Sequence, residues 1–261
     1  MFLAFNILVS IILGIVEGLT EFLPISSTGH LILVNQFLNF TQNISEQFTY
    51  IFDVIIQLGA ILAVIVYFRQ RLKNIYLWKK VIYAVIPALI IGALLGDYIE
   101  KLLFNPYTVA IALIIGGIII FFVENKKNID KIDQVEKITY KKALAIGLIQ
   151  CLAMIPGTSR SAATIIGGRL LGASRIAAAE FSFFLAIPTM IAASGYSLLK
   201  SGFDLNGTEI IILTIGFIIS FVAALLVVKY FLKYISHHDF KIFGYYRIVL
   251  GILVLVYFIL K

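Results

Sequence analysis

Long apolar stretches alternate with short polar loops along the whole chain. Six of these stretches approach the roughly 20 mostly apolar residues that a helix needs to cross a membrane. They cover residues 52–68, 81–96, 106–123, 181–199, 210–228 and 242–260. Their charged residues are Asp53, at the start of the first stretch, and Arg247 in the last. The pattern predicts six transmembrane helices.

Two further apolar regions, residues 2–37 and 143–171, are each interrupted near the middle by a proline among small polar residues. The interruptions read LPISSTGH at residues 23–30 and IPGTSRS at residues 155–161. Proline lacks a backbone donor, and the residue before it resists the helical conformation. Non-helical backbone at membrane depth is tolerated only where it is buried in protein or lines a wet cavity. We therefore expect two re-entrant helical hairpins.

The composition supports a membrane protein. The chain is 61% hydrophobic and 13% charged, with a mean hydropathy of +1.02, whereas a soluble domain is about 45–50% apolar and about 25% charged. This excludes a water-soluble enzyme, a disordered chain and a nucleic-acid-binding domain. The single cysteine, Cys151, excludes a disulfide framework.

The net charge of +7 indicates topology, because the basic residues gather in three loops at residues 69–80, 125–142 and 229–241. The positive-inside rule places all three loops in the cytoplasm. Loops 97–105 and 200–209 are poor in basic residues and fall outside. With six spans and two re-entrant hairpins, successive loops alternate consistently between the two sides of the membrane, and both termini lie outside.

An internal repeat runs through the chain. Residues 14–28 (GIVEGLTEFLPISST) align with residues 147–160 (GLIQCLAMIPGTSR) after one deletion, and residues 52–60 align with residues 181–189. Each half holds one hairpin and three spans. Since three is odd, the second half must be inverted relative to the first.

We therefore predict an all-α polytopic membrane protein with six transmembrane helices and two re-entrant hairpins in two inverted-topology repeats. The repeats cover about residues 1–127 and 140–261 of one integral membrane domain, residues 1–261. Inverted repeats with broken helices are typical of secondary transporters. A secondary transporter or a lipid flippase is accordingly one functional hypothesis.

Ionisable residues inside a membrane mark functional sites, and the first hairpin contains Glu17, Glu21 and His30. The two glutamates are four residues apart and share one helix face. A divalent cation, Mg²⁺ or Ca²⁺, or an opposing guanidinium would stabilise both carboxylates. The alternative is one neutral, hydrogen-bonded glutamate and one that reaches for the membrane interface.

Three hydroxyl residues, Ser26, Ser27 and Thr28, follow the break at Pro24. They could cap the next helix, whose free N–H groups make an anion site. A hydroxyl near the imidazole of His30, backed by carboxylates, has the parts of an activated nucleophile or an acid–base pair. The alternative is that small residues allow close helix packing.

The second hairpin supplies a positive charge, Arg160. Hydroxyl residues surround it in the sequence: Thr158, Ser159, Ser161 and Thr164. A guanidinium with hydroxyls and free N–H groups at a helix start can hold a phosphate. Alternatively, Arg160 pairs structurally with Glu17 or Glu21, and the two interpretations are compatible.

The motifs EGLTEFLPISSTGHLIL (residues 17–33) and PGTSRSAAT (residues 156–164) resemble the two signature motifs of the bacitracin-resistance undecaprenyl-diphosphatases. The resemblance covers the whole chain in length, repeat and span pattern. One departure is Ala162, where the family usually has glycine. The resemblance implies hydrolysis of undecaprenyl diphosphate to undecaprenyl phosphate, the lipid carrier of peptidoglycan synthesis, with bacitracin resistance as a result.

By motif position, the resemblance assigns one set of residues to catalysis: Glu17, Glu21, Ser27, His30 and Arg160. It assigns a second set to substrate contacts: Ser26, Thr28, Ser159, Ser161 and Thr164. It further implies a divalent cation, Mg²⁺ or Ca²⁺, on Glu17 and Glu21, and a site that faces the outer side of a bacterial inner membrane. The nucleophile is expected to be Ser27 or a water activated by His30.

The expected partners are a polyprenyl diphosphate lipid and the membrane lipids, with no nucleic acid, and a homodimer stays open. The transporter and phosphatase hypotheses differ in one measurement, which is the release of phosphate by the purified protein.

Overall fold

The computed structural model describes residues 2–38, 45–126, 130–201 and 205–260, and within them the chain is almost entirely helical. The helices are α1 (Phe2–Thr20), α2 (Ser27–Leu38), α4 (Glu46–Tyr67), α5 (Ile75–Leu103), α6 (Pro106–Glu124), α7 (Tyr140–Gln150), α8 (Arg160–Leu170), α9 (Arg175–Ser201), α10 (Gly207–Ile235) and α11 (Lys241–Leu260). Short 3₁₀ turns lie at Arg71–Lys73, Val135–Lys137 and Cys151–Met154.

Within the described residues, seven helices are long and apolar enough to cross a membrane. Six of them overlap the predicted spans, on α4, α5, α6, α9, α10 and α11. The seventh is Leu3–Thr20 of α1, in the region where the sequence predicts a re-entrant hairpin. Large apolar side chains such as Leu94, Phe122 and Leu199 are exposed on the outside of the bundle, where lipid would cover them. The chain is an all-α polytopic membrane protein, and the re-entrant insertion stays a prediction.

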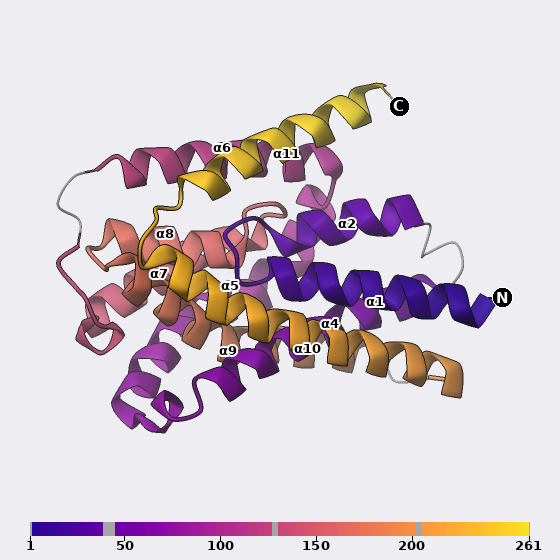
Figure 1. Cartoon of the computed structure of the whole chain (residues 1–261), viewed down its shortest axis with the longest axis horizontal. Helices are drawn as coiled ribbons and strands as arrows, with labels where there is room; N and C mark the ends of the chain where they lie inside the picture. The colour runs from indigo at the N-terminus through magenta and orange to yellow at the C-terminus, as the bar shows by residue number, and fades with distance from the viewer. Residues whose placement is uncertain (1, 39–44, 127–129, 202–204, 261) are drawn as a thin grey trace.

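The basic loops gather at one end of the bundle. The connections from α4 to α5, from α6 to α7 and from α10 to α11 all lie toward the left in Figure 1. The start of α1, the end of α11 and the turn between α5 and α6 lie toward the opposite end. This arrangement agrees with the side assignment that the basic residues indicate.

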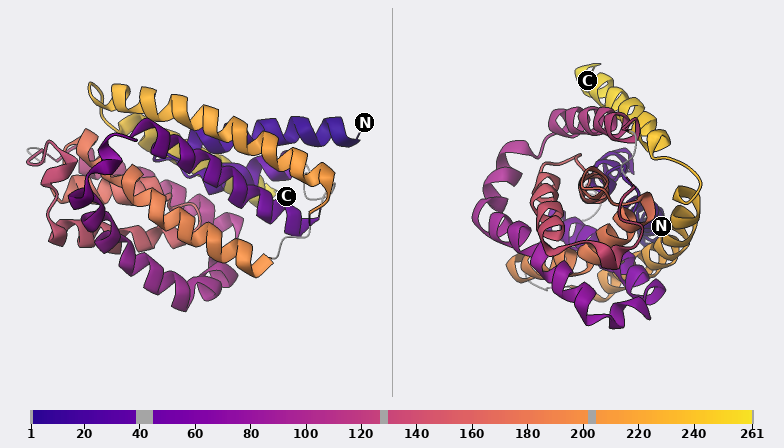
Figure 2. Two further views of the ribbon diagram at one scale, coloured as in Figure 1. Left: turned by 90° about the horizontal axis from the view of Figure 1, so that it is seen from below. Right: turned by 90° about the vertical axis from the view of Figure 1, so that its left-hand side faces the viewer.

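Two pairs of consecutive helices start from opposite ends of the bundle. Helix α1 starts at the end where the termini lie and the chain turns back into α2, whereas α7 starts at the basic end and the chain turns back into α8 (Figure 1). In the view along the bundle (Figure 2, right), the longer helices form a ring around α8. Residues 161–169 of α8 are all buried. The first break, residues 21–26, is almost entirely buried, and in the second break Pro156 and Gly157 are buried while Leu152 is exposed.

Helices of the first half of the chain pack against helices of the second half. Helix α10 packs on α1 and α4, while α5 packs on α7 and α9, and α6 packs on α11. The aligned glycines Gly14 and Gly147 both allow a close helix crossing. A Cβ on Gly14 would lie 2.7 Å from the Gly216 carbonyl oxygen, and one on Gly147 would lie 1.9 Å from that of Ala84. The inverted orientation of the halves itself stays a prediction.

Ion pairs connect the end of α6 to the ends of α8 and α9 at the basic end of the bundle. The fully buried carboxylate of Glu124 pairs with Arg175 at 2.5 Å and with Arg169 at 3.4 Å. In the adjoining loops, Arg71 hydrogen-bonds to Glu136 at 2.8 Å. Partial burial disfavours the charged form of Glu136, but the contact with Arg71 outweighs it and holds the pKa of this carboxyl below its usual value.

Candidate active site

Both helix breaks end in a serine with a left-handed backbone. Ser26 and Ser159 each have φ = 71°, a conformation that is uncommon for residues other than glycine. Each serine then caps the helix that follows it. The Ser26 hydroxyl accepts from the Gly29 N–H at 3.3 Å, and the Ser159 hydroxyl accepts from the Ala162 N–H at 3.2 Å. The breaks thus start α2 and α8 in the same way.

The N-termini of α2 and α8 approach each other from opposite ends of the bundle (Figure 1). A helix start carries unsatisfied N–H groups and the positive end of the helix dipole. Free N–H groups at a helix start are suited to hold an anion. The two helix starts therefore direct their positive dipole ends toward one interior region.

Glu21 lies between the two helix starts and binds residues from both. Its Oε2 accepts a 2.5 Å hydrogen bond from the Ser27 hydroxyl, and its Oε1 accepts a 2.8 Å bond from Arg160 Nη2. The side chains of Glu21 and Arg160 are only 7% and 11% exposed. The structure therefore brings Glu21, Ser27 and Arg160 together, although 139 residues separate the charged pair in sequence.

Arg160 is held in place by groups of α9. Its Nη1 donates to the Ser182 carbonyl oxygen at 3.0 Å, and its Nη2 lies 3.4 Å from the Met190 sulfur. The guanidinium also lies 5.9 Å from the ring centroid of Phe22. Its Nε is buried and has no hydrogen-bond partner within the described parts of the chain. The guanidinium is thus oriented by the protein and keeps donor capacity for a ligand.

The remaining predicted contact residues divide into two groups. Ser161 donates to the Leu23 carbonyl oxygen at 2.7 Å, which joins α8 to the first break. Thr164 hydrogen-bonds to the Arg160 carbonyl oxygen at 2.9 Å and to the Ser182 hydroxyl at 2.6 Å, which supports the start of α8. Ser26, Ser27, Thr28 and Ser159, by contrast, line the cavity described below.

Glu17 lies one turn before Glu21 and is completely buried. Neither of its carboxylate oxygens has a hydrogen-bond partner among the described residues. A buried, unpaired carboxylate is costly. Glu17 is therefore suited to bind a cation or a proton.

His30 lies on the first turn of α2 and faces α11. Its Nδ1 donates to the Ser26 carbonyl oxygen at 2.7 Å, so this nitrogen carries a proton. Its Nε2 lies 2.6 Å from the Tyr246 hydroxyl, and the two rings are stacked. The Ser27 hydroxyl donates to Glu21, and the partners of the His30 ring are the Ser26 carbonyl oxygen and the Tyr246 hydroxyl.

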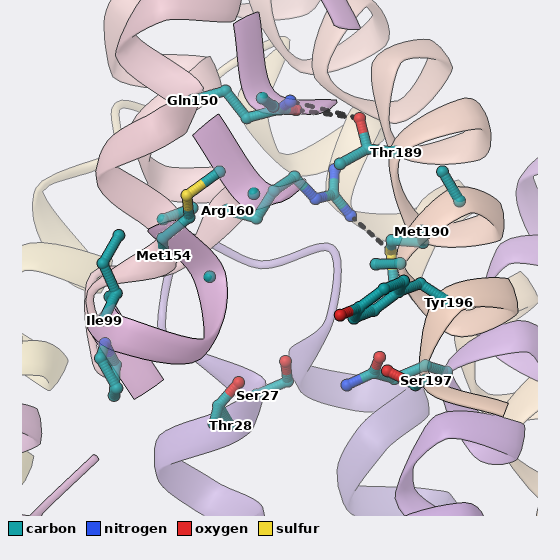
Figure 3. Close-up of a pocket in the computed structure, with 18 of the residues that line it drawn as sticks. Ser27, Thr28, Ile99, Gln150, Met154, Arg160, Thr189, Met190, Tyr196 and Ser197 are labelled. Atoms are coloured by element: carbon teal, nitrogen blue, oxygen red, sulfur yellow. Dashed lines mark hydrogen bonds between the residues drawn. The ribbon is translucent and has the colours of Figure 1, made fainter. Parts of the chain in front are cut away.

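A cavity of about 680 Å³ is lined by Glu21, Arg160 and the hydroxyl residues of the two breaks, whereas Glu17 and His30 are not among its lining residues. Figure 3 shows Arg160 extending into it from one side, with the hydroxyls of Ser27 and Thr28 facing it from the other. Helices α5 and α9 form its apolar wall through small residues: Ala88, Gly92, Ala93, Ala192 and Ala193. Asp97 and Lys200, which are paired at 2.9 Å, mark its end away from the basic loops.

Several residues of the site carry no sequence signal that identifies them. Ser182 and Met190 lie in an ordinary apolar span, Phe22 precedes the break, and Tyr246 and Arg247 come from α11. The only sequence feature that pointed to Ser182 and Arg247 is that each is a polar residue within an apolar span. Gln150, which aligns with Glu17, lines the cavity and hydrogen-bonds to Thr189 at 3.2 Å.

The described residues offer few side-chain donors for a metal. No group of three or more His, Cys, Asp or Glu side chains with metal-site geometry occurs in the part of the chain that the structure describes. The unpartnered oxygens of Glu17 nevertheless fit a hard cation, which binds through carboxylates, waters and phosphate oxygens.

The fold and the site together define a multi-pass membrane protein in which two interrupted helices bring Glu21, Ser27 and Arg160 together. The chain belongs to the bacitracin resistance protein BacA family, whose model matches residues 10–253. This confirms the family that the two motifs indicate.

The chain is similar to several undecaprenyl-diphosphatases over nearly the full length of each protein. Undecaprenyl-diphosphatase 1 of Clostridioides difficile (strain 630) is 53% identical over 264 residues, with 96% of each chain covered. The undecaprenyl-diphosphatase of Enterococcus faecalis is 50% identical over 267 residues, also with 96% of each chain covered. The undecaprenyl-diphosphatase of Acinetobacter baumannii (strain ATCC 17978) is 48% identical over 264 residues, covering 97% of this chain and 96% of that protein.

Proposed function

We propose that this protein hydrolyses undecaprenyl diphosphate to undecaprenyl phosphate and inorganic phosphate, which recycles the lipid carrier of cell-wall synthesis and confers bacitracin resistance. The observation that carries the proposal is the contact of Glu21 with both Ser27 and Arg160 between two helix starts. A phosphoryl-transfer site needs a nucleophile, a base and fixed positive charge, and these three residues supply them. The names of the relatives support the substrate.

In the proposed chemistry, Arg160 and the N–H groups at the starts of α2 and α8 bind the oxygens of the terminal phosphate. Ser27 Oγ attacks the terminal phosphorus, its proton passes to Glu21, and the bond from this phosphorus to the bridging oxygen breaks. The lipid phosphate leaves. Water then hydrolyses the phosphoserine, which releases inorganic phosphate and restores Ser27. Direct attack by a water on the same phosphorus is the alternative route.

We also propose that Glu17 and Glu21 hold a divalent cation, Mg²⁺ or Ca²⁺. The support is the buried carboxylate of Glu17, whose oxygens accept no hydrogen bond from any residue that the structure describes. A divalent cation supplies positive charge for the carboxylates and the phosphate oxygens.

The substrate side is proposed to be the outer face of a bacterial inner membrane. The cavity reaches Asp97 and Lys200, at the end of the bundle away from the three basic loops. Because basic loops remain in the cytoplasm, this end faces outward. The apolar wall between α5 and α9 is proposed to take the first isoprene units of the lipid tail.

The purified protein in detergent is expected to release phosphate from undecaprenyl diphosphate when Mg²⁺ is present. Glu21→Gln is expected to lower kcat by about 10²–10⁴-fold, because the amide cannot accept the Ser27 proton. Asp133→Asn, in an exposed loop, serves as the control and keeps its activity. Absence of phosphate release with any divalent cation, together with lipid transport in liposomes, would support the transporter hypothesis instead.

A chelator is expected to abolish phosphate release, and Mg²⁺ or Ca²⁺ is expected to restore it. Glu17→Gln should raise the cation concentration for half-maximal activity by about tenfold or more, because it removes a charged ligand. Titration of the cation against activity measures this shift. An unchanged half-maximal concentration in Glu17→Gln contradicts the assignment of Glu17 to the cation.

Ala93→Trp is expected to raise KM for undecaprenyl diphosphate by about tenfold, because the indole fills the apolar wall of the cavity. A short-chain substrate such as farnesyl diphosphate should be affected less. Leu94→Trp is the matched control, since Leu94 is 76% exposed on the outside of α5. Equal effects of Ala93→Trp on both substrates would place the tail elsewhere.

A further inference from the structure

Arg247, on α11, is a completely buried arginine that neither motif contains. It has no ion pair with a carboxylate among the described residues; its partners are backbone carbonyl oxygens. The Nε donates to Leu113 at 3.3 Å. The Nη1 donates to Pro24 at 3.2 Å and to Thr158 at 3.0 Å. The Nη2 donates to Ala112 and to Gly157, each at 3.0 Å. All of its nitrogen atoms are therefore used by the protein.

These carbonyls come from three places that are distant in sequence. Pro24 belongs to the first break, Gly157 and Thr158 belong to the second, and Ala112 and Leu113 belong to α6. A helix break leaves buried carbonyls without intrahelical partners, which is costly in an apolar interior. A planar guanidinium with five N–H donors can satisfy several of them at once, and a lysine ammonium with three donors cannot reach the same set.

The surroundings of Arg247 are shaped to admit its guanidinium. A Cβ on Gly116 would lie 2.2 Å from Nη2. Gly157 has φ = +88°, and its Cβ would lie 2.5 Å from the Val109 carbonyl oxygen. Glycine at both positions lets α6, the second break and the guanidinium meet at one point.

We propose that Arg247 is a positioning residue that fixes the two helix breaks relative to each other. It binds Pro24, three residues before Ser27, and Thr158, two residues before Arg160. Through these carbonyls it sets the distance between Ser27 and Arg160 without touching the substrate. Only the kinetic test of this inference rests on the proposed function.

The kinetic test compares Arg247→Lys, which keeps the charge, with Gly116→Ala, which keeps the arginine but displaces its guanidinium. Both are expected to lower kcat by about tenfold or more while KM stays within about threefold, because misplaced groups affect the transition state most. Gly195→Ala is the matched control, since a Cβ there meets no atom within 4 Å, and it keeps wild-type kinetics. Wild-type kcat in Arg247→Lys or in Gly116→Ala overturns the proposal.

Amide hydrogen exchange of the protein without substrate tests the same inference independently of phosphatase activity. In both variants, peptides that cover residues 21–31 and 155–165 should exchange about tenfold faster or more, while peptides of α10 stay unchanged. Unchanged exchange in both breaks overturns the proposal, and so does a general loss of folded protein in both variants, since Arg247 is then needed for the fold as a whole. Wild-type protein that releases no phosphate yet shows the expected exchange refutes the proposed function alone.

Discussion

Replacing Arg160 by lysine is expected to lower kcat/KM for phosphate release by about 10³-fold or more. Arg160 donates to Glu21, to the Ser182 carbonyl and toward Met190 through fixed positions on one plane. A lysine keeps the charge but loses this planar set of donors. Arg160→Lys should therefore slow mainly the phosphoryl-transfer step, in which the charge on the phosphate is redistributed.

The control for Arg160→Lys is Arg69→Lys, an exposed change in a basic loop that should leave the kinetics unchanged. Size-exclusion chromatography of both variants checks that they are folded, because a change at Arg160 also alters the buried ion pair with Glu21. A folded Arg160→Lys protein with more than about a tenth of wild-type kcat/KM contradicts the role of the planar guanidinium.

Ser27→Ala is expected to reduce kcat by about 10³-fold or more if the serine oxygen is the nucleophile. The hydroxyl donates to Glu21 at 2.5 Å, so its proton already has an acceptor. The alanine removes the attacking atom while the cap from Ser26 to Gly29 remains in place. Phosphate release measured at saturating substrate gives kcat directly.

An acid quench during turnover should trap a phosphate on the peptide that contains Ser27, and mass spectrometry detects it. Ser236→Ala, an exposed serine at the end of α10, is the control and should remain active. A Ser27→Ala protein that keeps most of its activity removes the serine as nucleophile and leaves direct attack by water.

The sequence was sufficient to predict the spans and the two breaks. Apolar stretches without charge have few alternatives to a membrane helix, and Pro24 and Pro156 interrupt the helices for local reasons. The contact between Glu21 and Arg160 was also among the predictions, since two opposite charges inside an apolar bundle are stabilised by pairing. These inferences depend on residue chemistry and need no knowledge of packing.

The details that the sequence did not reveal depend on packing. His30 was expected beside Ser27, yet its ring pairs with Tyr246 and the Ser26 carbonyl, which only the position of α11 determines. The partners of Arg247 are backbone carbonyls, which every residue has, so no side-chain pattern identifies them. The left-handed backbone of Ser26 and Ser159 could not be predicted either, because serine adopts this conformation only where the surrounding structure requires it.

The ion pair between Glu21 and Arg160 has a consequence for the selectivity of the enzyme toward the phosphate esters of the cell. Any phosphate that enters the cavity competes for Arg160 with a carboxylate that belongs to the same chain and is therefore always at high local concentration. A small, water-soluble ester offers little beyond its charge and is expected to lose this competition. In the proposed mode of binding, a lipid diphosphate adds the transfer of its tail to the apolar wall of the cavity. The proposed site is therefore expected to favour membrane lipids over soluble phosphate esters.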